Sequence, residues 1–169
     1  MKAWGAYVAS TCSARNVEFV RSLGADEVVD HANSTISKSL QNFDVVLDGT
    51  FDKEAELLDT LKTQAGAVYV TIASPKIRLA DEFGLEGGFR RADQLLAERM
   101  SAQAQLGRRY IWGFMRPDGR ALAQVAALVD RGLIRPLIDH VFPLSEVAAA
   151  HEYCEAGAAR GKIVLDLIA

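Results

Sequence analysis

The sequence contains few of the residues that build disulfide-stapled or metal-bound domains. Its two cysteines, Cys12 and Cys154, lie far apart and form no CxxC pair, which excludes a disulfide framework or a zinc cluster as the basis of the fold. The three histidines, His31, His140 and His151, include no pair at the helical i, i+4 spacing. We therefore expect no metal site and a reduced compartment.

Long apolar runs and strong charge of either sign are also missing. No run approaches the roughly 20 residues that cross a membrane, so we expect no membrane span. The first ten residues, MKAWGAYVAS, lack the basic stretch and long apolar block of a secretory signal. The net charge of -3 argues against nucleic acid as a partner, because such binders usually carry a basic face. The sequence also holds no Walker loop and no GxSxG elbow.

Short apolar runs alternate with helical patterns along the whole chain. The 169 residues suit one domain, and half of them are hydrophobic. Strands connected through helices predict right-handed crossovers and a parallel sheet, hence an α/β fold with helices on both faces of the sheet. We expect strands at residues 6–9, 27–30, 43–48, 67–72, 109–114, 137–142 and 163–165. We expect helices at residues 13–23, around 36–40, and at 52–62, 91–106, 121–131 and 147–155.

Polar residues and glycines indicate where these helices begin and end. Ser13, Asp118 and Ser145 each stand where a side chain can cap a helix. The glycines divide into two groups: Gly24 and Gly132 should end helices, whereas Gly84, Gly87 and Gly88 should mark a loop.

Several motifs, taken in order, resemble one enzyme superfamily. Residues 23–30 read LGADEVVD, residues 43–48 read FDVVLD and residues 159–165 read ARGKIVL. These runs resemble the medium-chain dehydrogenase/reductases, in particular the zinc-free quinone oxidoreductase branch. Residues 66–71 (GAVYVT), 110–114 (YIWGF), 132–136 (GLIRP) and 142–145 (FPLS) resemble a mitochondrial subgroup of that branch and its bacterial relatives. The resemblance implies a Rossmann-like, NAD(P)-binding domain.

The resemblance also implies that residues 1–169 are a partial domain. Residues 1–4 resemble the tail of the first Rossmann helix, so the first strand, its glycine-rich loop and a GroES-like catalytic domain are expected outside this sequence. Because that strand is central, its neighbours should have unpaired backbone groups. We still expect residues 6–9 and 45–47 to lie in one sheet. The isolated chain should be marginally stable or pair with a second copy, with residues 110–114 as a candidate edge for a homodimer.

The turn after the first expected strand is the best local signal for a cofactor. NAD-specific domains place a carboxylate there to bind both ribose hydroxyls. This chain has no carboxylate between residues 10 and 16, and Ser13 and Arg15 can instead bind a 2′-phosphate. We therefore predict NADPH as the cofactor. The alternative is that Ser13 only caps its helix and Arg15 is a solvated charge.

Two further candidates depart from the family pattern. His31 stands where relatives carry a tyrosine near the adenosine, and a plain surface histidine is the alternative. Gly49 stands where relatives often carry asparagine at the end of a strand. Glycine loses the side-chain amide there but lets the backbone approach a ligand.

The remaining candidates come from the resemblance alone. Thr71 and Ile72 would line the nicotinamide side, or they are simply core residues. Gly113 and Phe114 would face the nicotinamide amide, and core packing of Phe114 is compatible with that role. A turn that reaches back to the cofactor in relatives corresponds to Arg160, Gly161 and Lys162, although such basic residues usually face solvent.

Three functions remain in competition at this point. The first is an oxidoreductase in which NADPH transfers hydride to a quinone or an α,β-unsaturated carbonyl without zinc. Such chemistry needs no catalytic side chain from this chain, because the nicotinamide carries it. The second is a truncated, inactive interaction or dimerisation module. The third, a Rossmann-like methyltransferase, is disfavoured because the acidic residue that it usually carries after its second strand is missing. The compartment would be the cytoplasm or the mitochondrial matrix, since a presequence would lie outside this chain.

Overall fold

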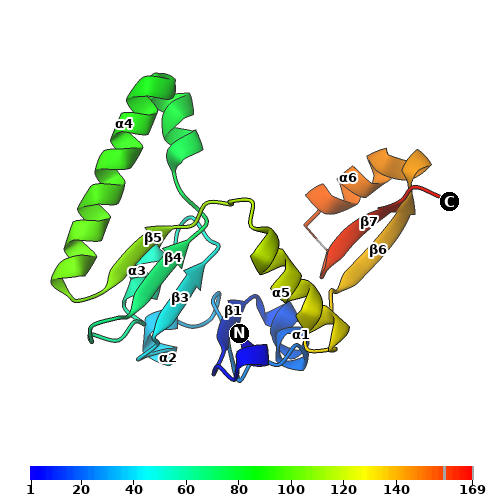
Figure 1. Ribbon diagram of the computed structural model, residues 1–169, viewed down its shortest axis with the longest axis horizontal. Helices are drawn as coiled ribbons and strands as arrows, with labels where there is room; N and C mark the ends of the chain where they lie inside the picture. Colours follow the sequence, from blue (N-terminus) through cyan, green and yellow to red (C-terminus); the bar gives the residue numbers. More distant parts are fainter. Residues whose placement is uncertain (158, 169) are drawn as a thin grey trace. The chain divides into compact units, whose positions relative to one another are not determined.

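The computed structural model describes residues 1–157 and 159–168 and divides into two compact units, Met1–Arg116 and Pro117–Ala169. Each unit is described by itself. The first contains η1 (Lys2–Trp4), β1 (Ala9–Cys12), η2 (Ala14–Asn16), α1 (Val17–Ser22), β2 (Glu27–Asp30), α2 (Ile36–Ser39), β3 (Val45–Asp48), α3 (Glu54–Leu58), β4 (Val68–Thr71), α4 (Lys76–Gln105) and β5 (Arg109–Trp112) (Figure 1). The second contains α5 (Gly119–Asp130), β6 (Ile138–Pro143), η3 (Leu144–Glu146), α6 (Val147–Glu155) and β7 (Lys162–Asp166).

All strand pairs of the described residues are parallel, so the predicted α/β class with parallel sheets is confirmed. The first unit holds two sheets: β1 pairs with β2, and β3, β4 and β5 form a second sheet in that order. The expectation that residues 6–9 and 45–47 share one sheet is therefore wrong. The first ladder also begins later than predicted, at Ala9, and runs through Cys12. The reason is that Asp26 binds the Val8 amide with its side chain, which leaves the ladder to start at the next residue.

Two apolar clusters stabilise the first unit. The larger is built on Tyr69, Tyr110 and Trp112 from the inner face of the three-stranded sheet, with the rings of Tyr69 and Tyr110 stacked 5.1 Å apart. The smaller joins Val29, Ile36 and Leu40 beside the β1–β2 pair. Phe43 and Leu57 pack against both clusters, so the two sheets share one core.

The insert between β4 and β5 is a helical hairpin rather than a loop followed by a helix. α4 bends sharply at Gly84 (φ 73°, ψ 164°), and its two arms fold back on each other (Figure 1). The predicted loop therefore shrinks to Gly84, while Gly87 and Gly88 are helical. A Cβ atom on Gly88 would lie 2.4 Å from the Ala80 backbone, so glycine there allows the two arms to touch.

This close approach makes Gly88→Ala a specific test of the hairpin. The added methyl group meets backbone atoms that cannot rotate away, so we expect the free energy of unfolding to fall by about 2 kcal/mol. Gly87→Ala is the matched control, because its Cβ would meet only the Phe83 Cβ at 3.6 Å. Loss of the glycine entropy cost should make that variant neutral or more stable by about 0.5 kcal/mol. Chemical denaturation measures both, and equal melting of the two variants would contradict the hairpin contact.

The second unit is built around the parallel pair β6–β7, which α6 contacts. Asp118 caps α5 as predicted, since its side chain accepts hydrogen bonds from the amides of Arg120 and Ala121. Ser145 does not cap α6, because it lies inside η3 and the residue at the cap position is Glu146. The expectation of one domain over residues 1–169 stays a prediction.

Candidate functional site

The carboxyl ends of β1, β2 and β3 gather around one cavity of about 330 Å³. Thr11 comes from β1, His31 directly follows β2, and Thr50 follows β3 by two residues. Lys53 and Leu57 complete much of the wall. In open α/β sheets ligands bind outside this end of the strands, so this cavity lies where such a fold binds its ligand.

The predicted phosphate-binding residues lie in the turn that follows β1, the strand whose Thr11 lines this cavity. Ser13 precedes η2, and Arg15 lies within it and is exposed. The interpretation of Ser13 as a helix cap is wrong, since its side chain makes no cap hydrogen bond. Its hydroxyl oxygen instead accepts a hydrogen bond from the side-chain amide of Asn16 at 3.5 Å. Its hydroxyl therefore keeps its capacity to donate a hydrogen bond to a ligand.

A carboxylate that sequence reasoning missed lies close to the same turn. Asp30 is the β2 partner of Cys12. Its two oxygens accept hydrogen bonds from the Ala32 amide at 3.0 Å and the Asn33 side chain at 2.6 Å. These bonds, led by the one from Ala32, lower the pKa of Asp30, so it is ionised at neutral pH. No local sequence signal reveals this charge, because the parallel pairing of distant strands brings it to the turn.

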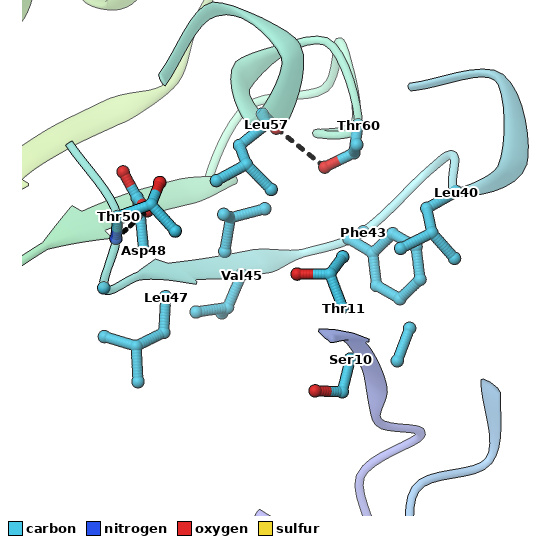
Figure 2. Close-up of a pocket in the computed structure, with 13 residues that line it drawn as sticks. Ser10, Thr11, Leu40, Phe43, Val45, Leu47, Asp48, Thr50, Leu57 and Thr60 are labelled. Atoms are coloured by element: carbon cyan, nitrogen blue, oxygen red, sulfur yellow. Dashed lines mark hydrogen bonds between the residues drawn. The ribbon is translucent and has the colours of Figure 1, made fainter. Parts of the chain in front are cut away.

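The turn after β3 is fixed by a buried hydrogen-bond network. Asp48 is almost fully buried and accepts hydrogen bonds from the amide and the hydroxyl of Thr50, both at 2.7 Å (Figure 2). Its other oxygen accepts a hydrogen bond of 2.5 Å from the completely buried Tyr69 hydroxyl. Burial and this carboxylate together raise the pKa of Tyr69 far above its ordinary value, so it stays a donor. The network sets the backbone path of Gly49, the exposed candidate residue between Asp48 and Thr50.

Four candidates, Thr71, Ile72, Gly113 and Phe114, lie at the ends of β4 and β5. Their burial and contacts bear on whether each is a core residue or faces a ligand. Thr71 is buried, and its hydroxyl accepts a hydrogen bond from the Ala73 amide, which fits a structural role. Ile72 and Phe114 are 67% and 53% exposed, so core packing is excluded for both. A Cβ atom on Gly113 would lie 3.5 Å from the Ile72 Cγ2 atom, which is an ordinary van der Waals distance. The Lys76 ammonium lies 5.2 Å from the centre of the Phe114 ring, which gives this apolar edge a positive charge.

Three predicted residues, Arg160, Gly161 and Lys162, belong to the second unit. The Arg160 amide donates a hydrogen bond to Asp139 at 3.2 Å, and Lys162 begins β7. A Cβ atom on Gly161 would lie 2.7 Å from the Leu137 carbonyl oxygen, so the turn requires glycine for its own packing. A structural reason for the RGK motif therefore exists within this unit, and contact with a cofactor stays a prediction.

Sequence reasoning missed Thr11, Thr50 and Lys53, which line the cavity beside His31. The available signal was that Thr11 and Thr50 lie close to the carboxyl ends of the predicted strands, whereas Lys53 directly precedes α3 and carried no such signal. Within residues 1–157 and 159–168, no group of three or more His, Cys, Asp or Glu side chains could hold a metal ion. None of the helices in this described part combines the length and apolar character that a membrane crossing requires.

Comparison with known proteins gives these features a family. Residues 23–165 match the family model described as zinc-binding dehydrogenase. The chain belongs to this zinc-binding dehydrogenase family. It is 38% identical over 172 residues to the NAD(P)H oxidoreductase RTN4IP1, mitochondrial, of Danio rerio, and 37% identical to the Homo sapiens protein of the same name. Each alignment covers 99% of this chain but only 44% and 43% of the relative. This zinc-binding dehydrogenase chain thus spans less than half the length of these curated relatives.

Solved structures agree with this family assignment. The quinone oxidoreductase of Coxiella burnetii is similar over 98% of this chain and 46% of its own, with a TM-score of 0.73 and 26% identity. An NAD-dependent alcohol dehydrogenase shares the fold with a TM-score of 0.74 at 21% identity. The chain therefore has the Rossmann-like fold of the dehydrogenase nucleotide-binding domain, as the sequence motifs predicted.

The described residues fit part of a dinucleotide. Hydroxyls and cations suited to a ribose phosphate lie at the ends of β1 to β3, and an exposed apolar edge suited to a nicotinamide ring lies at Ile72 and Phe114. A Cβ atom on Gly49 would meet nothing closer than the Ile72 Cδ1 atom at 4.0 Å, so backbone can approach a ligand there. The sequence has no GxGxxG loop to bind the pyrophosphate.

Proposed function

We propose that residues 1–169 form the nucleotide-binding part of an NADPH-dependent oxidoreductase that reduces a quinone or an α,β-unsaturated carbonyl. The observation that carries the proposal is the gathering of Thr11, His31 and Thr50 at the carboxyl ends of three parallel strands. Relatives named NAD(P)H oxidoreductase and a structure described as a quinone oxidoreductase support the reaction class.

In this proposal the chain binds and orients the cofactor, which supplies the hydride. Arg15 and the Ser13 hydroxyl bind the 2′-phosphate, and Lys53, which lines the cavity, adds a positive charge. The ionised Asp30 carries a negative charge that opposes this attraction, and in this proposal the positive charges of Arg15 and Lys53 outnumber it. Ile72 and Phe114 offer an apolar surface to the nicotinamide. The acceptor pocket lies largely in the part of the family's polypeptide that this chain does not match.

The cofactor preference has a direct test in Arg15→Gln. Loss of the guanidinium removes a charge-assisted contact to the 2′-phosphate, so NADPH affinity should fall about tenfold, equivalent to about 1.4 kcal/mol. NADH has no such phosphate and should bind equally well before and after the change. Fluorescence titration of both cofactors on the longest natural polypeptide that contains residues 1–169 measures the ratio. Arg21→Gln on α1 is the control, because that exposed arginine pairs with Glu18.

Two results would reject the proposed cofactor or its site. One is equal affinity of the parent protein for NADPH and NADH. The other is an equal loss of NADPH affinity in the Arg15 and Arg21 variants, which would make the effect one of net charge. We expect NADPH-dependent quinone reduction only from the longer polypeptide. Activity of the 169-residue chain alone would contradict the assignment of the acceptor pocket to the unmatched part.

Dimerisation and compartment remain proposals of the same kind. Within Met1–Arg116, β5 lies at the edge of its sheet, and we propose that its outer side pairs with a second copy. The relatives are named mitochondrial, and we propose the mitochondrial matrix over the cytoplasm on that basis. Sedimentation and immunolocalisation test these two points.

A further inference from the structure

Lys76, the first residue of α4, connects three parts of the first unit. Its ammonium forms an ion pair of 3.2 Å with Asp93, which lies on the other arm of the hairpin. It also lies 5.9 Å from the centre of the Phe89 ring and 5.2 Å from that of Phe114, just beyond β5. The charge of Lys76 is therefore fixed next to the exposed apolar edge at Ile72 and Phe114.

The backbone holds this apolar edge at the end of the sheet. The Ile72 amide donates a hydrogen bond to the Asp48 carbonyl at 3.0 Å. The Gly113 amide donates one to the Thr71 carbonyl at 2.7 Å, so the three-stranded sheet continues by one residue beyond β4 and β5. Gly113 has no side chain to cover Ile72, which is 67% exposed. A flat ring can therefore lie against this edge while a group at its rim reaches Lys76.

The stability of the hairpin gives little reason for a lysine at this position. The two arms already touch where Gly88 packs against Ala80. The side chains of Lys76 and Asp93 are 30% and 67% exposed, and such partly solvated ion pairs contribute little to stability. The helix dipole also disfavours a cation at the first residue of a helix. The folded chain therefore gains little from the charge of Lys76.

The ammonium of Lys76 keeps the capacity to bind a further partner. It has three N–H donors, and among the residues that the structure describes Asp93 is its one anionic partner. The rings of Phe89 and Phe114 attract the positive charge but offer it no oxygen acceptor. An incoming carboxylate can share the ammonium with Asp93 or replace it, because an exposed ion pair costs little to break.

We infer that Lys76 determines which acceptors are reduced, because its ammonium binds a carboxylate group of the acceptor at the rim of the apolar edge. The inference rests on the proposed function, in which the nicotinamide lies against Ile72 and Phe114. An oxygen bonded to the ammonium at about 2.8 Å lies no more than about 8 Å from the centre of the Phe114 ring. The carboxylate and the double bond that accepts the hydride are therefore a few bonds apart. The acceptor is thus a small α,β-unsaturated carbonyl or quinone that carries a carboxylate.

Binding of a redox-inert aromatic acid tests this inference on the 169-residue chain without added cofactor. The probes are 2-naphthoate and its neutral amide, 2-naphthamide, which have nearly the same shape and differ in charge. Amide chemical shifts are followed by NMR at each residue. We expect naphthoate to shift the amides of Ile72, Gly113 and Phe114. It should bind about tenfold more tightly than naphthamide, as one hydrogen bond between charged groups predicts.

Lys76→Met and Asp93→Asn break the same ion pair but should change binding in opposite directions. Lys76→Met removes the cation, so the affinity for naphthoate should fall about tenfold while that for naphthamide changes by less than about twofold. Asp93→Asn removes the competing carboxylate, so the affinity for naphthoate should rise about threefold. Lys76→Arg retains the charge and should retain the preference for naphthoate. A lysine that only stabilises the hairpin would give the same change in binding for Lys76→Met and Asp93→Asn.

Arg78→Met is the matched control for net charge. Arg78 lies two residues further along α4, is exposed and pairs with Glu82. Because salt screens an exposed charge, its loss should change the affinity for naphthoate by less than about twofold. An equal loss of affinity in the Arg78 and Lys76 variants would make the effect one of net charge and would overturn the inference.

Steady-state kinetics of the longest natural polypeptide that contains residues 1–169 extend the test to acceptors. The pair trans-4-oxo-2-pentenoate and its methyl ester are α,β-unsaturated carbonyls that differ in one charge. We expect Lys76→Met to lower the ratio of kcat/KM for the acid to that for the ester about tenfold, through a higher KM for the acid. A polypeptide that binds no NADPH would reject the proposed function, whereas the naphthoate titration would still decide the role of Lys76.

Three further outcomes overturn the inference. The first is equal affinity of the parent chain for naphthoate and naphthamide. The second is a set of naphthoate-induced shifts centred on Thr11, His31 and Thr50, which would place the ligand in the 330 Å³ cavity instead. The third is a change of affinity in the same direction for Lys76→Met and Asp93→Asn.

Discussion

Replacing Arg108 with methionine is expected to lower the free energy of unfolding by about 4 kcal/mol, the largest effect of any single change proposed for this chain. Arg108 is buried, and its guanidinium donates hydrogen bonds to the carbonyls of Lys62, Leu61 and Leu58 at 2.9, 2.9 and 3.2 Å. These carbonyls lie at the end of α3 and in the segment that follows. Methionine preserves the apolar stem but leaves the carbonyls buried without this donor.

Thermal melting measures this effect, and we expect the midpoint to fall by about 10 °C for a chain of this size. Arg109→Met is the matched control, because Arg109 is adjacent in sequence but exposed. Its free energy of unfolding should change by less than about 0.5 kcal/mol. Arg108→Lys preserves the charge without the planar fork and should recover only a minor part of the loss. Equal melting of the two methionine variants would contradict the role of Arg108.

Replacing Asp48 with alanine is expected to cost about 3 kcal/mol of stability, because three hydrogen bonds disappear and the buried Tyr69 hydroxyl loses its acceptor. The effect should extend to function. Without its anchor the backbone at Gly49 and Thr50 is released, and in the proposed enzyme we expect NADPH and NADH affinity to fall together by about tenfold. Denaturation and cofactor titration measure the two effects separately.

Two conservative variants show which hydrogen bonds of Asp48 matter for stability and which matter for cofactor binding. Asp48→Asn retains an oxygen that can accept from Thr50, but its amide cannot accept from the Tyr69 hydroxyl, so we expect a loss of about 2 kcal/mol, smaller than that of Asp48→Ala. Tyr69→Phe removes one bond and leaves Thr50 anchored, so cofactor affinity should be preserved while stability falls. A loss of affinity in Tyr69→Phe as large as that in Asp48→Ala would show that the turn at Gly49 is not the reason.

The sequence predicted most elements of the fold, because local patterns determine them. The alternation of apolar runs with helical segments predicted β2 to β7 closely but placed the first strand three residues too early. Asp118 caps α5, as predicted. Predictions failed where a distant residue decides the outcome. Gly88 lies in a helix rather than a loop, and glycine is needed there because the other arm of α4 leaves no room for a Cβ atom. β1 begins at Ala9 because Asp26 binds the preceding residue. Nothing near these positions in the sequence reveals those partners.

The candidate site was predictable to a similar extent. The resemblance placed Gly49, Ile72 and Phe114 at the ends of strands, where the structure has them. It could not show that Asp30 approaches the turn at Ser13, because that proximity arises from the pairing of β1 with β2. Burial of Asp48 likewise depends on Tyr69, which lies 21 residues further along the chain. Sequence indicates which residues end a strand, whereas the sheet decides which of these ends meet.

Phe43 and Leu57, which pack against both apolar clusters of the first unit, have a consequence for cooperativity. In a continuous sheet, a ladder of backbone hydrogen bonds would couple the two clusters. In the first unit the side chains of Phe43 and Leu57 connect them instead. The residues around each cluster can therefore open as a separate foldon, at a free energy below that of global unfolding.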